Sequence, residues 1–416
     1  MTPHGGGDLR TVEEHLKLVL QRIAPPDPIE LALLDAQGLL SAEEVVAAAP
    51  LPGFDNSAMD GYAVRSEDVA GASAEQPAVL PVVGDIAAGS RVPTGIGRGM
   101  CVRIMTGAPM PAGADAVVPV EWTDGGVARV SIDRPPAPGA YVRRTGEDVQ
   151  AGDTAIGLGA PIGPAQVGLL AAVGRERVLV RPRPRVVVVS TGSELVDVGQ
   201  RPGPGELIDS NSYLLAAASR DAGAEVYRAG IVPDDRRALL EVLEAQANRA
   251  DLLVTSGGVS MGAYDVVKDA LRDLGTMEFV RVAMQPGMPQ GFGTLGDPGT
   301  PVFCLPGNPV SALVSFEVFV RPAIRLMLGK RRLFRRSVTA SALEPMESPA
   351  GRRQYRRGLL HREESGGYCV RPVGGPGSHL LAALAQANCL IVIDAAVTVV
   401  PAGDQVTVLP LLLSSA

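Results

Sequence analysis

Cysteine and histidine are scarce in this chain, with 4 of each among 416 residues. The cysteines, Cys101, Cys304, Cys369 and Cys389, stand far apart, and each lies among apolar residues. This pattern predicts buried free thiols rather than disulfides or metal ligands. The histidines are equally scattered, so the sequence offers no cluster of the kind that holds zinc.

Long apolar runs and dominant positive charge are also missing. The longest apolar stretches, 186–189 and 313–320, are too short or too interrupted by polar residues to cross a bilayer. The N-terminus carries Asp8, Glu13 and Glu14 and lacks the apolar stretch of a secretory signal, so we expect a cytoplasmic protein. The net charge of -7 and the mostly dispersed arginines predict no nucleic-acid partner.

The sequence does contain the pattern of several folded domains. Hydrophobic residues make up 46% of a chain whose length exceeds what one core usually serves, so we expect two to four domains. Thr11 to Glu14 predict a capped helix, and short apolar stretches between glycines and prolines predict a β-rich segment over about 50–141. A short helix is predicted over 165–172. From Arg185 onwards strands, glycine loops and helices alternate, which indicates a doubly wound parallel α/β domain, and β signals return after the basic tract 330–336.

Three glycine-containing loops follow predicted strands of the α/β domain. In an open parallel sheet such loops expose backbone N–H groups at the carboxyl ends of the strands, where ligands bind. Loops 190–194 and 305–311 are equally compatible with an ordinary turn or helix cap and with an anion site. Loop 256–262 leads into a helix, so its amides and the helix dipole favour phosphate or pterin binding.

Acidic residues recur beside these loops and elsewhere in the chain. They are Asp60, Asp148, Glu194, Asp234, Asp235 and Asp265. Any one of them is more often a solvated or capping carboxylate, and only their convergence in space would indicate a metal site. Two or three carboxylate oxygens beside a phosphate suit magnesium better than zinc.

Six motifs in a fixed order carry a further signal. They are 55–62 (DNSAMDGY), 103–108 (RIMTGA), 146–148 (GED), 191–195 (TGSEL), 256–260 (SGGVS) and 305–311 (LPGNPVS). Residues 351–353 (GRR) and 377–379 (GSH) extend the series. Together they resemble the molybdopterin molybdotransferases (MoeA and gephyrin E-domain-like proteins) over nearly the whole chain.

The resemblance implies an α/β multidomain fold with a central doubly wound, MogA-like domain. Its expected parts are a linking domain (1–45 plus 142–180), a β-rich lid domain (46–141), the α/β molybdopterin-binding domain (181–329) and a C-terminal β-barrel domain (330–416). It also implies a homodimer in which the lid of one subunit faces the α/β cleft of the other. Asp60 and Thr106 would then serve the partner's site.

In this family, molybdate is inserted into adenylylated molybdopterin with magnesium assistance and release of AMP. The resemblance implies catalytic roles for Asp60, Thr106, Asp148, Glu194, Asp234 and Asp265, the last three around the metal. The implied substrate-binding residues are Thr191, Gly192, Ser256, Gly257, Gly258, Ser260, Arg281, Pro306, Asn308, Ser311, Arg353 and Ser378. Among these, Arg353, Ser378 and Ser311 match the oxyanion contacts for molybdate.

One motif departs from the family pattern. Family members usually read K-P-G-K-P where this chain reads Gln285 to Pro289 (QPGMP), so two ammonium groups near the anions are absent. Each missing cation removes on the order of a few kcal/mol from the binding of a dianion in a partly dry site. Three hypotheses follow: an enzyme with a shifted site, a dimeric scaffold, and a carrier that binds molybdopterin without turnover. The scaffold would bind a protein partner in a groove beside the terminal β domain, as gephyrin's E domain binds a receptor segment. A cell-division component is one such partner, since some bacterial relatives are tied to cell division.

Overall fold

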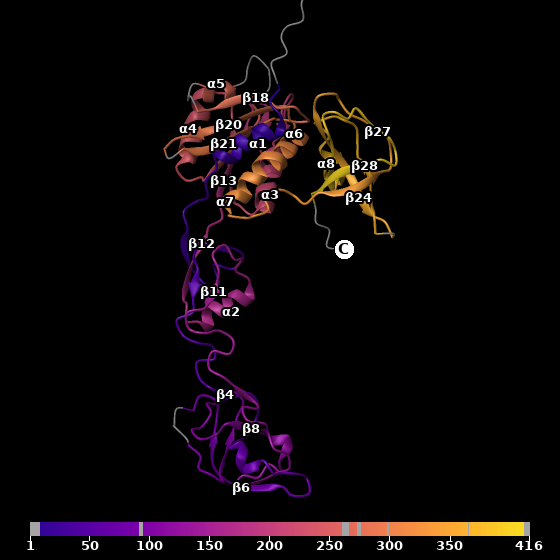
Figure 1. Cartoon of the computed structure of the whole chain (residues 1–416). Helices are drawn as coiled ribbons and strands as arrows, with labels where there is room; N and C mark the ends of the chain where they lie inside the picture. The colour runs from indigo at the N-terminus through magenta and orange to yellow at the C-terminus, as the bar shows by residue number, and fades with distance from the viewer. Residues whose placement is uncertain are drawn as a thin grey trace, which may run out of the picture. The chain divides into compact units, whose positions relative to one another are not determined.

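The computed structural model describes residues 9–90, 95–259, 266–272, 276–297, 299–364 and 366–411. The chain forms two compact units, one of residues Glu30–Val180 and one of Met1–Ile29 with Arg181–Ala416 (Figure 1). Across the described ranges, no helix is both long enough and apolar enough to span a membrane. The four-domain division expected from the sequence is finer than these two units and stays a prediction.

The second unit is built on a six-stranded sheet. Its strands run in the order β16 (Glu225–Val232), β13 (Arg185–Thr191), β17 (Leu252–Ser256), β21 (Thr300–Leu305), β20 (Pro289–Leu295) and β18 (Glu278–Arg281). The first four are parallel, whereas β20 and β18 are antiparallel to their neighbours. The predicted α/β domain is confirmed, with a mixed sheet rather than a wholly parallel one.

Helices cover both faces of this sheet. In β13, Val186 and Val188 pack into one core cluster, and Val187 and Val189 pack into another, because successive side chains point to opposite faces. The first face is covered by helices α1 (Val12–Gln21), α3 (Asn211–Ala222), α6 (Pro309–Ser315) and α7 (Arg321–Met327). The second face is covered by α4 (Arg236–Ala247) and α5 (Val266–Arg272). With both faces buried, the carboxyl ends of the parallel strands are where a ligand can reach the sheet.

Helix α1 begins at the predicted capping box. The Thr11 side chain accepts a hydrogen bond from the Glu14 backbone, and the Glu14 side chain accepts one from the Thr11 backbone. Val12 and Val19 are buried in the core of the α/β unit. The expected division grouped this helix with residues 142–180, whereas its apolar face packs here on the α/β unit.

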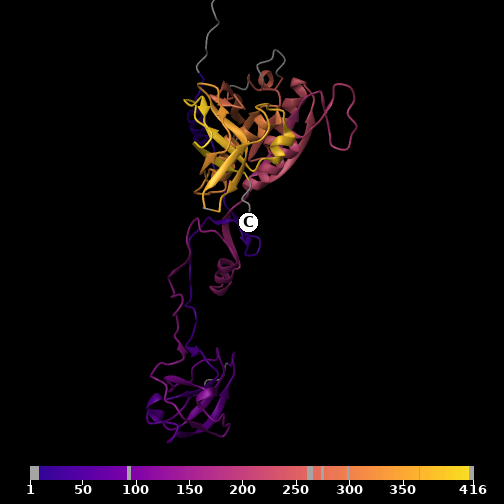
Figure 2. The same cartoon turned by 90° about the vertical axis from the view of Figure 1, so that its right-hand side faces the viewer.

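A small β-barrel completes the same unit (Figure 2). Its strands follow the order β24 (Arg353–Arg362), β25 (Tyr368–Pro372), β22 (Val338–Ala342), β28 (Gln405–Pro410) and β26 (Cys389–Ile393). Pairing of β24 with β26 closes the barrel, which removes the free sheet edges. The short strand β19 (Met284–Gln285) pairs with β24 and links the barrel to the α/β sheet. This barrel confirms the β signals after residue 336.

The unit Glu30–Val180 is rich in β structure, as predicted. Its largest sheet has the order β8 (Ala116–Pro119), β5 (Gly61–Val64), β7 (Cys101–Ile104), β6 (Ala78–Ile86) and β9 (Arg129–Ile132). Smaller sheets join β1 (Ile29–Ala32), β12 (Arg177–Arg181) and β2 (Leu40–Ser41), then β3 (Val45–Val46) with β11 (Thr154–Ile156), and β4 (Asn56–Ser57) with β10 (Val142–Arg143). The predicted short helix is α2 (Pro164–Ala172). All four cysteines are buried and free, which confirms that prediction.

Candidate functional site

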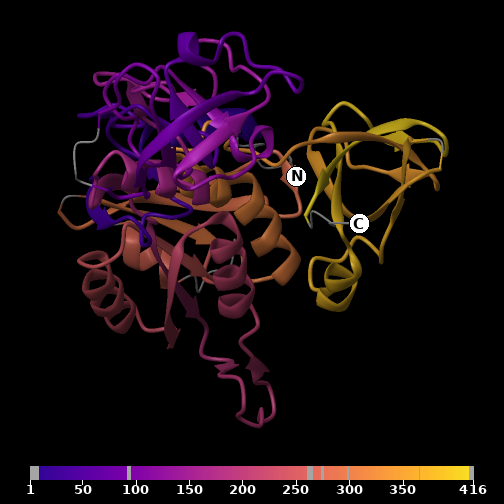
Figure 3. The ribbon, with the colours of Figure 1, turned by 90° about the horizontal axis from the view of Figure 1, so that it is seen from below.

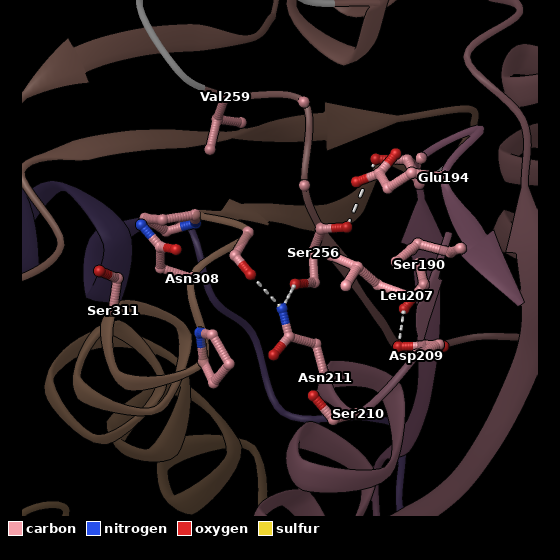
Figure 4. A pocket seen from close by; sticks show the side chains of 18 of the residues that line it. Ser190, Glu194, Leu207, Asp209, Ser210, Asn211, Ser256, Val259, Asn308 and Ser311 are labelled. Atoms are coloured by element: carbon pink, nitrogen blue, oxygen red, sulfur yellow. Dashed lines mark hydrogen bonds between the residues drawn. The ribbon is translucent and has the colours of Figure 1, made fainter. Parts of the chain in front are cut away.

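A cavity of about 780 Å³ opens at the carboxyl ends of β13, β17 and β21 (Figure 4). The three glycine loops line it, together with the start of α3. The predicted site residues that it brings together are Thr191, Gly192, Glu194, Asp234, Ser256, Gly257, Gly258, Pro306, Asn308 and Ser311. The loop between β14 (Leu195–Val196) and β15 (Leu207–Ile208) projects from the unit beside the cavity (Figure 3).

Glycine is required where the loops meet. Gly257 has φ +103°, and a Cβ there would lie 2.4 Å from the backbone oxygen of Thr191. Gly258 has φ +66°, and its added Cβ would lie 2.3 Å from Val267. Both the left-handed backbone and the close approach exclude larger residues. The Gly257 amide also donates to the Leu305 carbonyl at 3.1 Å, so the loops after β17 and β21 are held in contact.

Two polar residues at the start of α3 were not singled out from the sequence. Asn211 Nδ2 donates to Ser256 Oγ at 2.8 Å and to the Gly307 carbonyl at 2.6 Å. Asp209 is buried, and its Oδ1 accepts from Ser190 Oγ at 2.9 Å and from the Ser212 amide at 3.1 Å. The polar run 209–212 before a predicted helix was the one available signal, and it is equally typical of a helix cap.

Three acidic residues line the cavity: the buried Asp209, and Glu194 and Asp234 on loops after different strands. Asp234 Oδ2 accepts from the Ser193 amide at 3.1 Å, and the Asp234 amide donates to Ser193 Oγ at 2.9 Å, which ties Asp234 to the loop that carries Glu194. The third predicted metal ligand, Asp265, and the predicted phosphate contact Ser260 fall outside the described residues. In the part that is described, no group of three His, Cys, Asp or Glu residues is placed to hold a metal ion. The pair Glu194 and Asp234 is an all-oxygen donor set of the kind that Mg²⁺ takes alongside substrate phosphates.

The cavity is poor in positive charge. Among its described lining residues there is no lysine or arginine, and His379 is the one side chain able to carry a positive charge. The Asn308 side chain makes no capping hydrogen bond to α6, so its amide is available to a ligand. The donors that this lining offers to an anion are therefore backbone amides, hydroxyls, the Asn308 amide and His379.

Three other predicted residues of this unit do not line the cavity. Arg281 donates from Nε and Nη2 to the Met288 sulfur at 3.3 and 3.2 Å. Arg353 is paired with Glu13 and, at 3.3 Å, with Asp394. The carbonyl of Ser378 accepts from the amide of Val310 in the first turn of α6, next to the loops of the cavity.

A buried arginine that the motifs did not mark lies beside Ser378. Arg357 is 5% exposed, and its guanidinium donates to the carbonyls of Gly375 and, at 2.9 Å, Gly377. No ion pair to a carboxylate is found for it within the described chain, and burial, with Arg356 nearby, lowers the pKa of its guanidinium. Together with Gln285 it lines a small cavity between the α/β sheet and the barrel. The basic run 352–357 could be recognised in the sequence, but only the fold shows that Arg353 is ion-paired and Arg357 is buried.

The remaining predicted residues lie in the unit Glu30–Val180. Asp60 Oδ1 accepts from the Thr106 amide at 2.6 Å and from Thr106 Oγ1 at 2.8 Å. These bonds lower the pKa of the exposed Asp60 carboxyl, so it is charged near neutral pH. Asp148 is exposed on the same unit.

A doubly wound sheet whose glycine loops and carboxylates converge on one cavity defines an α/β protein that binds a phosphate-bearing ligand. Three family models match the chain: the MoeA N-terminal region (domain I and II) over residues 10–174, a probable molybdopterin binding domain over 187–326, and the MoeA C-terminal region (domain IV) over 339–411. The chain belongs to the MoeA family of molybdopterin molybdenumtransferases, transferases of molybdenum cofactor biosynthesis. The resemblance seen in the six motifs is thereby confirmed.

Individual relatives agree over almost the full length. The chain is 52% identical over 419 residues to molybdopterin molybdenumtransferase 1 of Mycobacterium tuberculosis, covering 96% of this chain and 98% of the relative. It is 36% identical over 408 residues to the molybdopterin molybdenumtransferase of Haemophilus influenzae, with 96% and 98% covered. A solved molybdopterin biosynthesis MoeA protein from Pyrococcus horikoshii matches with a TM-score of 0.84 and 31% identity, covering 97% of this chain and 100% of that one.

Proposed function

We propose that this protein inserts molybdate into adenylylated molybdopterin, with Mg²⁺-dependent release of AMP. The observation that carries the proposal is the convergence of three glycine loops with Glu194 and Asp234 on one cavity. The relatives are named for the transfer of molybdenum to molybdopterin, and the cavity offers the contacts that a phosphate-bearing pterin needs.

In this proposal the loops bind and orient the substrate phosphates. Glu194 and Asp234 would hold Mg²⁺, with Asp265 as the third predicted ligand. The bound ion would supply positive charge against the phosphoanhydride and the leaving AMP. The loops after β13 and β17 line the same cavity, and the amides of Glu194 and Gly258, which make no hydrogen bond to another described residue, would provide donors for the phosphate oxygens.

Molybdate needs its own donors, and the structure favours Arg357 over Arg353 for this role. The charge of Arg353 is neutralised by Glu13 and Asp394, whereas Arg357 is buried beside the loop of Ser378 without an acidic partner in the described ranges. A tetrahedral dianion is held best by a fixed guanidinium and hydroxyl donors. We place the molybdate contacts at Ser311, Ser378 and Arg357.

Replacement of Glu194 by glutamine tests the function. We expect E194Q to slow AMP release from adenylylated molybdopterin, in the presence of molybdate and Mg²⁺, on the order of a hundredfold, because an amide is a poorer Mg²⁺ ligand than a carboxylate. E244Q, at an exposed position of α4, is the matched control and should keep the wild-type rate. A wild-type protein that binds the substrate but never releases AMP would instead support the carrier hypothesis.

We also propose a homodimer in which Asp60 and Thr106 of one subunit serve the cavity of its partner. Support comes from the two hydrogen bonds between Asp60 and Thr106, which hold an exposed polar pair together on the unit Glu30–Val180. Neither residue belongs to the described lining of the cavity. Measurement of the mass in solution tests the dimer.

A second candidate function is a scaffold, favoured by an apolar groove between α1 and the barrel. The groove has a volume of about 320 Å³, and Leu16, Val318, Phe334 and Leu409 are among its lining residues. Phe334 is 58% exposed there, which leaves an aromatic anchor for an apolar segment of a partner. A scaffold predicts that E194Q retains partner binding and that F334D loses it while AMP release stays unchanged.

A further inference from the structure

We propose that Asn211 is a positioning residue of the insertion reaction, because it orients the Ser256 hydroxyl to donate a hydrogen bond to the substrate phosphate. The inference rests on the proposed function and names a determinant of substrate binding within that site. Asn211 is the first residue of α3, and Ser256 is the last residue of β17. Figure 4 shows the two side chains facing each other on the cavity wall.

The orientation of the Asn211 amide is fixed by the Gly307 carbonyl. Nδ2 lies 2.6 Å from this oxygen and 2.8 Å from Ser256 Oγ. A carbonyl oxygen can only accept, so turning the amide around would press two acceptor oxygens together. The nitrogen therefore faces both partners, and Ser256 Oγ accepts from it.

This arrangement leaves the Ser256 proton free. A hydroxyl carries one proton and two lone pairs, and Asn211 occupies a lone pair. Within the described residues Ser256 Oγ has no other hydrogen-bond partner, and the residue is 2% exposed on the cavity wall. A buried hydroxyl proton needs an acceptor, and the oxygen of a bound phosphate provides one. Because no lysine or arginine lines the described part of the cavity, each oriented hydrogen-bond donor contributes a larger share of the free energy of anion binding.

Asn211 also fixes the distance between two anion-binding loops. Its two hydrogen bonds connect the end of β17 with the loop after β21, where a Cβ on Gly307 would lie 3.5 Å from the Gly257 Cα. Aspartate at this position has the same size but no donor. It would accept the Ser256 proton, turn the lone pairs of the hydroxyl towards the substrate and repel the Gly307 carbonyl.

A double-mutant cycle with AMP and Mg²⁺, measured by calorimetry, tests this role. We expect N211A and S256A each to weaken AMP binding about ten- to a hundredfold, the effect of losing one hydrogen bond to a charged group. The double variant should bind AMP within about twofold of the weaker single variant, since Asn211 acts through Ser256. N211D should bind more weakly than N211A. N248A, an exposed asparagine at the end of α4, should match the wild type.

Losses that multiply in the double variant, or wild-type affinity in N211A, would overturn the proposal, because a merely structural residue acts independently of the Ser256 hydroxyl. Thermal unfolding is followed for every variant. If N211A does not fold, N211D replaces it in the cycle. The change in AMP affinity caused by N211D must then be smaller in S256A than in the protein with Ser256. An unchanged effect of N211D overturns the proposal. The two proposals can fail separately. If the effects of the Asn211 and Ser256 variants on AMP affinity are coupled but the wild-type protein releases no AMP from adenylylated molybdopterin, the proposed function is refuted and the role of Asn211 stands.

Discussion

At the scale of single residues, the site depends on backbone that approaches very closely. Gly257 and Gly258 can line the cavity because neither has a side chain to collide with the neighbouring loop or with α5. Close packing here means that the backbone of the loop is already fixed before a ligand binds, which lowers the entropic cost of binding an anion.

Replacement of Gly257 by alanine should abolish measurable AMP binding. The new Cβ would lie 2.4 Å from the Thr191 oxygen, so the loop has to shift, and the left-handed φ costs on the order of 1 kcal/mol in addition. Gly199→Ala is the matched control, since Gly199 also has positive φ (+95°) but open space around it. Calorimetry on both variants separates the collision from the backbone cost. Equal binding by the two would show that the close approach at Gly257 is not needed.

The absent lysines of the Q-P-G-M-P segment can be restored. Gln285 and Arg357 line the same small cavity, and Pro289, next to Met288, lines the large one. We expect Q285K/M288K to bind molybdate at least about tenfold more tightly, because two further cations attract a dianion. Q200K, in the exposed loop before β15, controls for a general gain of positive charge. Unchanged molybdate affinity in titrations of the double variant would mean that the anion binds elsewhere.

At the scale of elements, α1 depends on a buried imidazole. His15 is 1% exposed and meets the Phe319 ring edge-on at 4.8 Å. Burial, followed by the nearby Arg10, lowers the pKa of His15 from 6.5 to about 4. The folded state therefore favours the neutral ring. The contribution to stability is complete above the unfolded pKa and is lost as the pH falls from 6.5 through about 4.

The free energy of unfolding should thus decrease with acid more steeply in the wild type than in H15Q. The difference between the two profiles from about pH 7 to about pH 4.5 should approach 3 kcal/mol at most, because about two pH units of this window lie between the unfolded and the folded pKa of His15. Chemical denaturation at each pH measures it. H361Q removes an exposed histidine of β24 and should keep the wild-type profile. Parallel profiles for wild type and H15Q would show that His15 is not neutral in the folded helix.

At the scale of the whole molecule, the shared site of the proposed dimer can be tested by mixing. D60N and E194Q should each be nearly inactive as homodimers. In a mixed dimer one site combines Glu194 of one subunit with Asp60 of the other, so random exchange should restore about a quarter of the wild-type activity. AMP release after refolding the two variants together measures this. Activity that stays at the level of the separate variants would place both residues in the same subunit's site.

The elements and the family could be predicted from the sequence because both depend on local pattern. The capping box of α1, the strands of the central sheet and the short helix α2 appear where apolar spacing and caps predict them. The glycine loops were recognisable because a loop after a buried parallel strand opens at the ligand edge of the sheet.

Only the tertiary structure could choose among side chains that look alike in the sequence. Arg353 and Arg357 lie four residues apart, yet one is neutralised by Glu13 and the other is buried beside Ser378. Asn211 gained its role from Ser256 and Gly307, 45 and 96 residues away in the chain. Sequence alone determined which segments form strands, loops and helices, since these are set by neighbours along the chain. Which polar groups meet in the cavity was decided by packing between distant segments, and no local pattern records that.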